Sequence, residues 1–417
     1  MLQAIRPLVR SACAVAGTIS SAMVDFDPTA PGDAFFADPF PTYQRLRDSD
    51  RYHVNPDGSW FLTHYADLLA LYRHPRASSD KRALFKPKFG DTPIYEHHTT
   101  SLVFNDPPYH TRVRKQIAGA LSQRAIRALE SDLITAVDHL LDRFEPGTQI
   151  DLMAQYAAPI PLEVIGNLFG VPRPDRDQLL DWSVAILGAL EATLTQEESD
   201  RANGAVEDFL EYLRNLVTDR RRHPLDPEVD LLTRLIVGQD GDRLSEHELL
   251  HNLIFILNAG HETTASLIGT GVHSLLEHPD QLTRLRSDPS LLGSAIEEML
   301  RFQSPVQMGN RELTERIELD GTTLPAGAQV WLCIGAANRD PNQFPDPDRF
   351  DVGRRSNRHL AFVAGIHTCP GNTLSRMETA VALGRLLDRF PHLRLGDPPT
   401  RERRARFRRF SQLPVVL

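Results

Sequence analysis

The chain contains 417 residues, 41% of them hydrophobic and 24% charged, and carries a formal net charge of −9. This composition indicates a globular protein with a sizeable core, and its acidic balance argues against nucleic acid as the main partner, which would require a basic surface. No run of about 18 apolar residues predicts a membrane span. The three scattered cysteines exclude a disulfide framework and a CxxC zinc site, and they fit a reducing cytoplasm best.

The first 22 residues differ from the rest, because arginines are followed there by small residues that faintly resemble a secretion signal. Since the run is barely apolar, we expect either a floppy extension or a start codon placed too early, with Met23 as the working start. The ordered protein is expected to form one domain from residue 24 to residue 417.

Helical periodicity dominates the chain, with apolar residues at three- and four-residue spacing. It predicts helices over about 122–144, 160–169, 176–190, 200–221, 228–237, 290–303 and 371–390. Strand patterns occur at 59–64, 316–325 and 328–335, and Asp320-Gly321 is expected to form a hairpin turn. We therefore predict a mainly α fold with a small β-rich region.

The longest predicted helix covers 244–279 and begins with a capping box, Ser245 followed by Glu248. If unbroken, it is about 50 Å long and must cross the middle of the protein. Its centre, 259-AGHETT-264, nevertheless carries an acid and two alcohols. Buried polar groups need hydrogen-bond partners or water, so either a solvated kink or a functional centre explains this pattern.

Glu298 and Arg301 lie three residues apart in the predicted helix 290–303, where they can pair on one face. Such pairs usually lie at the surface and contribute little to stability, so the pattern alone does not assign them a role.

Cys369 precedes the predicted helix 371–390, and the unpaired N–H groups of a helix start favour thiolate. A thiolate is either a nucleophile or a metal ligand. A nucleophile would need an oriented base, and His367 is not assured to face the sulfur. An axial haem ligand would need nearby glycines, an aromatic shield and cations for the propionates. The candidates are Gly365, Gly371, Phe362, His359 and His367.

Several motifs in order give the chain a clear resemblance to a known family. They are 106-DPPYHTRVR-114, 259-AGHETT-264, 298-EMLR-301, 338-NRDP-341 with 344-FPDPDRF-350, and 359-HLAFVAGIHTCPG-371. Each is weak to moderate alone, but together they are very specific. From about residue 24 to the C-terminus, the chain resembles the cytochrome P450 family of the soluble bacterial type.

The resemblance implies a role for individual residues. Cys369 would be the proximal thiolate ligand of haem b (iron protoporphyrin IX), with Phe362 beside the sulfur and Gly371 after it. Glu298, Arg301 and Arg349 would form a structural triad under the haem. The residues implied to bind the propionates are His110, Arg114, Arg311, His359 and His367.

The resemblance also implies a distal site on the long helix. Glu262 and Thr263 would be the acid and alcohol that deliver protons for oxygen activation, and Ala259 and Gly260 would leave room for O2. The implied function is monooxygenation of a small to medium hydrophobic substrate by a monomer. Electrons would come from a separate ferredoxin or flavodoxin and its reductase, because no reductase domain fits in the chain.

Two other functions stay open. A peroxide-driven peroxygenase of the same fold would be expected to lack the acid and alcohol pair, which Glu262 and Thr263 argue against. A non-enzymatic haem-thiolate sensor would need no proton relay and usually carries an effector domain.

Three features depart from the family pattern or remain ambiguous. The family usually has glycine after the phenylalanine of the cysteine motif, where a special backbone angle or close packing occurs, and here the residue is Val363. The arginine-rich run 401–410 is expected to be a solvated surface segment, or alternatively to dock an acidic electron donor. Lys81, Arg82, Lys86 and Lys88 are also expected at the surface, unless one binds a substrate carboxylate.

Overall fold

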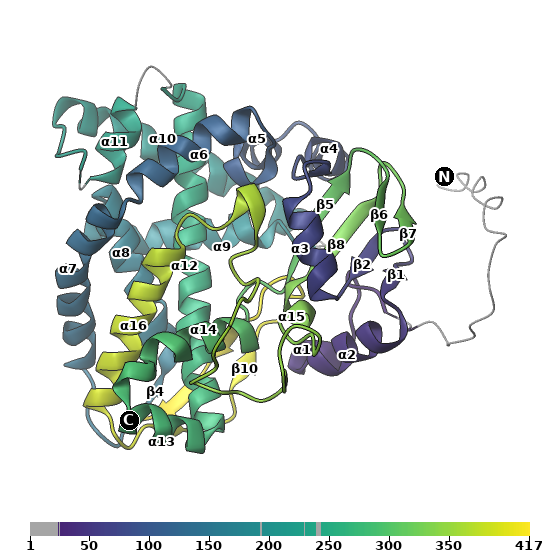
Figure 1. Cartoon of the computed structure of the whole chain (residues 1–417). Helices are drawn as coiled ribbons and strands as arrows, with labels where there is room; N and C mark the ends of the chain where they lie inside the picture. The colour runs from purple at the N-terminus through teal and green to yellow at the C-terminus, as the bar shows by residue number, and fades with distance from the viewer. Residues whose placement is uncertain (1–23, 25, 192–193, 229, 239–242) are drawn as a thin grey trace.

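The computed structural model describes residues 24, 26–191, 194–228, 230–238 and 243–417, so the proposed extension and Met23 lie outside the described residues. Helices fill the larger part of the molecule, and a β-rich part lies beside them (Figure 1). The helices are α1 (Asp33–Ala37), α2 (Phe40–Ser49), α3 (Tyr65–Arg73), α4 (Arg82–Phe89), α5 (Pro93–Thr100), α6 (Tyr109–Ala120), α7 (Gln123–Leu141), α8 (Pro159–Phe169), α9 (Arg176–Gly188), α10 (Gln196–Arg222), α11 (Leu231–Val237), α12 (Glu246–Glu277), α13 (Pro279–Ser287), α14 (Leu292–Phe302), α15 (Ile334–Ala337) and α16 (Asn372–Arg389). The predicted helices are thereby confirmed.

The strands are short and form small sheets. They are β1 (Tyr52–Val54), β2 (Trp60–Leu62), β3 (Ala77–Ser78), β4 (Gln149–Asp151), β5 (Met308–Leu313), β6 (Ile317–Leu319), β7 (Thr322–Leu324), β8 (Gln329–Cys333), β9 (Arg394–Leu395), β10 (Thr400–Arg401), β11 (Phe410–Gln412) and β12 (Pro414–Val416). The largest sheet has the order β1-β2-β8-β5-β3, in which β2 and β8 are parallel and pair Trp60 with Val330. Positive φ angles at Asp320 (45°) and Gly321 (80°) form the predicted turn between β6 and β7.

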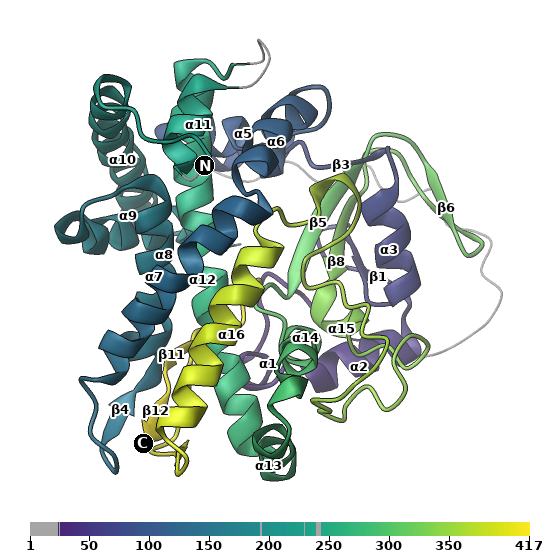
Figure 2. The same cartoon turned by 60° about the vertical axis from the view of Figure 1, so that its left-hand side comes forward.

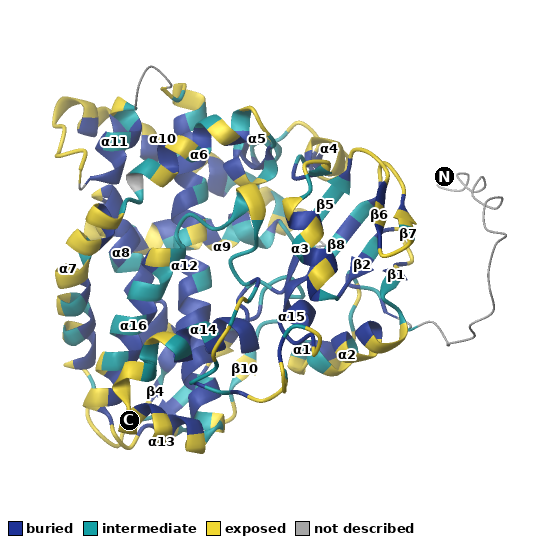
Figure 3. Cartoon of the chain, in the orientation of Figure 1, coloured by how far each residue is buried: buried dark blue, intermediate teal, exposed yellow. Residues whose placement is uncertain are grey.

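The long helix α12 runs through the middle of the helical part, beside α16 (Figures 1 and 2). The predicted capping box is present, because the Ser245 side chain accepts from the Glu248 N–H while the Glu248 side chain accepts from the Ser245 N–H. Figure 3 shows α12 as buried along most of its length. The apolar side chains of this helix are therefore buried against neighbouring segments on several of its faces.

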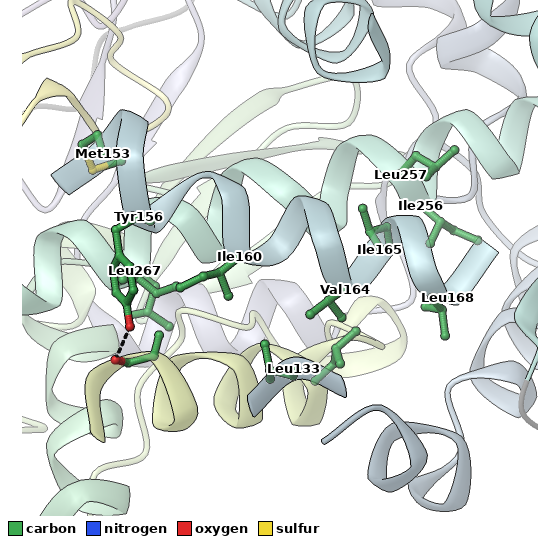
Figure 4. Close-up of a cluster of buried hydrophobic side chains, with 14 of the residues drawn as sticks. Leu133, Met153, Tyr156, Ile160, Val164, Ile165, Leu168, Ile256, Leu257 and Leu267 are labelled. Carbon is green, nitrogen blue, oxygen red and sulfur yellow. Dashed lines mark hydrogen bonds between the residues drawn. The ribbon is translucent and has the colours of Figure 1, made fainter. Parts of the chain in front are cut away.

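The core around α12 is formed by apolar side chains from α7, α8 and the π-helix Met153–Ala157 (Figure 4). Tyr156 closes this core toward α16, where its hydroxyl donates to the Ala382 carbonyl (2.7 Å). A Cβ at Gly269 would collide with the sulfur of Met153, so glycine allows the π-helix to approach α12. Small residues in α12 thus set how closely its neighbours pack.

A buried charge network joins α14 to the chain that follows α15. Arg301 binds both oxygens of Glu298 (2.7 and 2.8 Å), and both side chains are fully buried. The second guanidinium on Glu298 belongs to Arg354, whose Nε lies 3.0 Å from each oxygen. The predicted third member, Arg349, is exposed and contributes its backbone carbonyl to Arg301 (3.1 Å). The prediction that the Arg349 side chain joins the triad is therefore wrong. The backbone conformation after residues 344–350 directs the guanidinium of Arg354, and not that of Arg349, toward Glu298.

We expect Arg354→Met to lower the free energy of unfolding by about 1.5–3 kcal/mol, because it removes charge-assisted hydrogen bonds from a buried carboxylate that keeps Arg301 as its partner. The matched variant Arg349→Met should change it by less than about 0.5 kcal/mol, since this side chain is exposed. Urea unfolding followed by circular dichroism measures both. Equal losses in the two variants would contradict this network.

Candidate active site

Residues 362–371, called the cysteine loop, hold Cys369 just before α16. The Cys369 N–H donates to the Phe362 carbonyl (3.0 Å), and Asn372 Nδ2 donates to the Cys369 carbonyl (2.6 Å). Burial raises the pKa of the thiol, whereas the Gly371 N–H and two nearby arginines lower it. The helix start alone therefore does not guarantee the predicted thiolate, and a bound metal cation would supply the missing stabilisation.

The centre of α12 is accessible along one strip, called the α12 strip, which consists of Phe255, Ala259 and Thr263. Residues four apart share a helix face, so these side chains look in one direction. Thr263 Oγ1 donates to the Ala259 carbonyl (3.1 Å). The buried Thr264 instead donates to Ser375 Oγ in α16 (3.2 Å), six residues after Cys369. The strip thus belongs to the part of α12 that is docked near the cysteine loop.

Two glycines serve packing instead of the access that was expected of them. A Cβ at Gly260 would lie 2.9 Å from Ile165 Cδ1, so glycine lets α8 approach α12. Gly365 has a φ of 74° and lies against the Tyr72 carbonyl, which any side chain would strike. Gly371 differs, because the nearest atom to a Cβ there is Cys369 Sγ at 4.0 Å.

Four of the residues expected to bind propionates form a cation cluster, which consists of His110, Arg114, Arg311 and His367. The two histidine rings lie 4.2 Å apart, and His110 is only 1% exposed. Arg114 donates to a carbonyl of the cysteine loop. Burial, followed by the charges of the two arginines, lowers the pKa of His110 to about 4. Burial and Arg311 lower that of His367 to about 2.

The two arginines of the cation cluster supply the positive charge that fits a group with two carboxylates, and its neutral histidines can donate hydrogen bonds to such a group. Within the described residues, neither ring nitrogen of His110 nor Nε2 of His367 has a hydrogen-bond partner. The nearby Asp106 carboxylate accepts hydrogen bonds from Ser78 and Ser79. Buried polar groups without partners are costly, so an anion here is favoured. A haem with two propionates satisfies this requirement next to Cys369.

His359 is not brought into the cation cluster. Its Nε2 lies 3.2 Å from Glu297, which also accepts from Arg376 Nε (2.6 Å). Arg376 in turn covers the Phe362 ring at 4.6 Å. His359 therefore contributes to an ion-pair group beside the cysteine loop.

Glu262 is 4% exposed and forms ion pairs with Arg404 and with Arg409 (3.5 Å). The prediction that the run 401–410 is a solvated surface segment is therefore wrong. A buried carboxylate requires a counter-charge, and the run supplies it by folding back on α12. Among the arginines of this run only Arg403 is exposed. The run therefore presents little positive charge at the surface to which an acidic electron donor could bind.

The lysine-rich segment at the start of α4 divides into two kinds of residue. Arg82, Lys86 and Lys88 are exposed and each has a polar partner. Lys81 is 1% exposed, and its Nζ has no hydrogen-bond partner within the described residues. Burial lowers its pKa to about 7, with further lowering by two nearby arginines. The surface prediction is wrong for Lys81.

Val363 adopts a φ of 52°, which a β-branched residue rarely does. Its N–H donates to the Leu360 carbonyl (2.8 Å), and the side chain packs against the core of the β-rich part. The family's usual glycine would adopt this angle without strain. The expected unusual backbone angle is therefore present, with valine in it.

Comparison with known proteins agrees with this geometry. The family model for cytochrome P450 matches residues 51–414. Cytochrome P450 107B1 of Saccharopolyspora erythraea is 39% identical over 399 residues, which cover 92% of this chain and 96% of the relative. P450BioI, solved in complex with hexadec-9Z-enoic acid ligated acyl carrier protein, gives a TM-score of 0.88 at 33% identity, covering 93% and 100% of the two chains. Myxobacterial CYP267B1 in complex with myristic acid gives 0.84 at 36% identity, covering 92% and 97%.

The chain therefore belongs to the cytochrome P450 family, and it is a haem-dependent monooxygenase that acts with O2 on small molecules. Relatives at similar identity include proteins named as monooxygenases and hydroxylases. In the described part of the chain, every helix is too short or too polar to cross a membrane.

Sequence reasoning missed three side chains: Arg354 on Glu298, Arg404 on Glu262, and Arg406 near Lys81. One sequence feature could have indicated the pairing of Arg404 with Glu262. An acid in the middle of an apolar helix needs a counter-charge, and the run 401–410 offers several arginines. Which arginine meets which acid depends on contacts between distant segments.

We expect the Val363→Gly variant to be more stable than the Val363→Ala variant, with a free energy of unfolding that is higher by about 0.5 to 1 kcal/mol. Only glycine adopts the positive φ at this position without strain. Both variants remove most of the valine side chain, so packing losses largely cancel. The same pair at Val184, an exposed position in α9, should show the reverse order, since glycine weakens helices. Urea unfolding of the haem-bound protein measures all four, and the same order at both positions would contradict the strain.

Proposed function

We propose that residues 24–417 form a monomeric haem b monooxygenase that hydroxylates or epoxidises a hydrophobic organic substrate. The carrying observation is that the α12 strip, with its accessible threonine, lies on the part of α12 docked near the cysteine loop. We further propose a cytoplasmic location and a separate ferredoxin or flavodoxin with its reductase as the electron source. The free cysteines Cys333 and Cys369 support a reducing compartment.

In this proposal the Cys369 thiolate would hold the haem iron, and Phe362 and Gly371 would shape the surroundings of the sulfur. His110, Arg114, Arg311 and His367 hold the propionates, which would satisfy their unpaired nitrogens and charges. Bound haem supplies the O2 activation in which O2, two electrons and two protons give oxygenated substrate and water.

The proposed proton path starts at Thr263. Its hydroxyl donates to the Ala259 carbonyl and so can accept a hydrogen bond from a water on the α12 strip. Glu262 is next in the chain, and its Oε2 has no hydrogen-bond partner among the described residues. The arginine pair holds Oε1, so the buried Oε2 is the oxygen left to bind a water that enters this part of the helix. Glu262 would connect the water to solvent through the arginine segment.

Thr263→Ala should keep haem binding and substrate affinity but divert electrons to hydrogen peroxide, because the water that delivers the second proton loses its support. The control is Thr264→Ala, which removes the neighbouring hydroxyl that faces Ser375. Product formed per NAD(P)H oxidised, measured with a reconstituted electron-transfer chain, should fall in the first variant alone. Unchanged coupling in Thr263→Ala would remove its proton role, and full turnover with peroxide alone would favour a peroxygenase.

We also propose that the substrate carries a carboxylate, which Lys81 and Arg406 bind. Lys81 Nζ is buried without a hydrogen-bond partner within the described residues, and the partly exposed Arg406 lies over the Trp331 ring at 5.5 Å. Burial lowers the pKa of both side chains. Arg311 and then Arg406 are the charges that lower the pKa of Lys81 most after burial, and a substrate carboxylate beside Lys81 and Arg406 would offset the repulsion among these cations.

The position of Arg406 supports binding of substrate in preference to a structural anion. Arg404, two residues earlier, pairs with Glu262, which adjoins Thr263 on α12. The segment that carries Arg406 therefore passes the centre of α12. The fatty acid bound to CYP267B1 belongs to the chemical class proposed here.

Lys81→Met should weaken the binding of dodecanoic acid about tenfold or more, while dodecan-1-ol is affected little, because a charge-assisted hydrogen bond is lost. The haem spin-state shift on titration gives both dissociation constants, and Lys86→Met is the matched surface control. Equal losses for acid and alcohol, accompanied by release of haem, would assign Lys81 to a propionate and contradict the substrate role.

A further inference from the structure

The N-terminal turns of α12 carry the sequence 247-HELLH-251, whose histidines lie four apart on one helix face. Glu96 of α5 lies opposite them, with Oε1 at 3.7 Å from His247 Nδ1. One ligand atom from each of Glu96, His247 and His251 lies within 4.8 Å of the others. Two imidazoles at this spacing with a carboxylate form a common donor set for zinc.

His251 provides a second, independent sign of a ligand. It is 2% exposed, and its Nδ1 has no hydrogen-bond partner within the described residues. A neutral imidazole has one nitrogen lone pair that can bind a metal ion. An unpaired buried nitrogen costs free energy that coordination to a cation would remove.

We propose that Glu96, His247 and His251 bind a divalent transition metal ion, for which zinc is the natural probe. Tetrahedral zinc with nitrogen ligands at about 2.0 Å requires donor atoms roughly 3.4 Å apart. His247 and Glu96 are half exposed or more and can close the remaining gap by rotamer changes. Thr100 Oγ1 lies 3.2 Å from His247 Nε2, so Nδ1 is the ring nitrogen left to face Glu96.

The local charges favour a structural role for this site over hydrolysis. In the HExxH pattern the glutamate often acts as a general base, but Glu248 here caps Ser245 and pairs with Arg112. Glu96 supplies negative charge near the positive end of the α12 dipole, whereas Glu246 and Glu248 are paired with Arg221 and Arg112. The metal would therefore clamp α5 to the start of α12 and stabilise the segment that follows α4.

Zinc binding is measured directly, so its outcome does not depend on the monooxygenase assignment. The haem-bound full chain is treated with EDTA, desalted, and titrated with zinc chloride in a calorimeter. We expect one equivalent to bind and to raise the melting temperature. His247→Ala and Glu96→Gln should each weaken binding about tenfold or more. His223→Ala, at an exposed histidine of the α10 end, is the matched control and should bind like the parent.

Cobalt(II) provides a spectroscopic readout, because tetrahedral coordination gives visible absorption bands that octahedral aqueous cobalt lacks. These bands should be seen in the parent difference spectrum and be absent in His247→Ala, while the haem spectrum of the variant is unchanged. Zinc affinity that is equal in His247→Ala and His223→Ala, or no binding by the parent, would overturn the site.

Discussion

The helix α12 is buried along most of its length and yet has a polar, accessible centre. The hydrogen bonds, ion pairs and close contacts around it are those that such a helix requires. The buried hydroxyls of Ser266 and Thr270 are satisfied inside the helix by donating to the carbonyls four residues earlier (2.8 and 2.7 Å), whereas the buried Thr264 donates to Ser375 of α16. The buried acid of α12 is satisfied from outside by Arg404. Gly260 and Gly269 let neighbouring segments approach it closely, so helix packing and site geometry are set together.

The charge network at Glu298 supports the cysteine loop through a chain of hydrogen bonds. Arg301 donates to the Asn338 carbonyl (2.9 Å), and the Asn338 side chain accepts from the Leu360 N–H (2.7 Å). The Leu360 carbonyl then accepts from Val363 (2.8 Å) inside the loop. Consecutive hydrogen bonds therefore link the buried ion pair to the backbone of the cysteine loop. This explains how residues that look like an ordinary helix ion pair can matter for the site.

Sequence reasoning recovered what depends on local pattern and missed what depends on distant contacts. The periodicity and capping box of α12 and the Asp320-Gly321 turn are local, and they are present as expected. The partner of Glu298, the counter-charge of Glu262 and the burial of Lys81 join segments far apart in the chain. The local sequence does not distinguish Arg354 from Arg349, because the two differ in the direction of their side chains in the folded protein.

The valine in the cysteine loop illustrates how a fold can hold a strained residue. Left-handed backbone angles cost an ordinary residue about 1–2 kcal/mol, and they persist only where the surroundings fix the chain on both sides. Val363 meets this condition, since Leu360 holds its N–H and the neighbouring Phe362 carbonyl accepts from Cys369. Its side chain also packs against the core of the β-rich part, which returns part of the cost as buried apolar surface. Glycine would remove both the strain and this packing. Valine in place of the family's glycine therefore adds side-chain contact at the cost of backbone strain. The cysteine remains hydrogen-bonded at the start of α16.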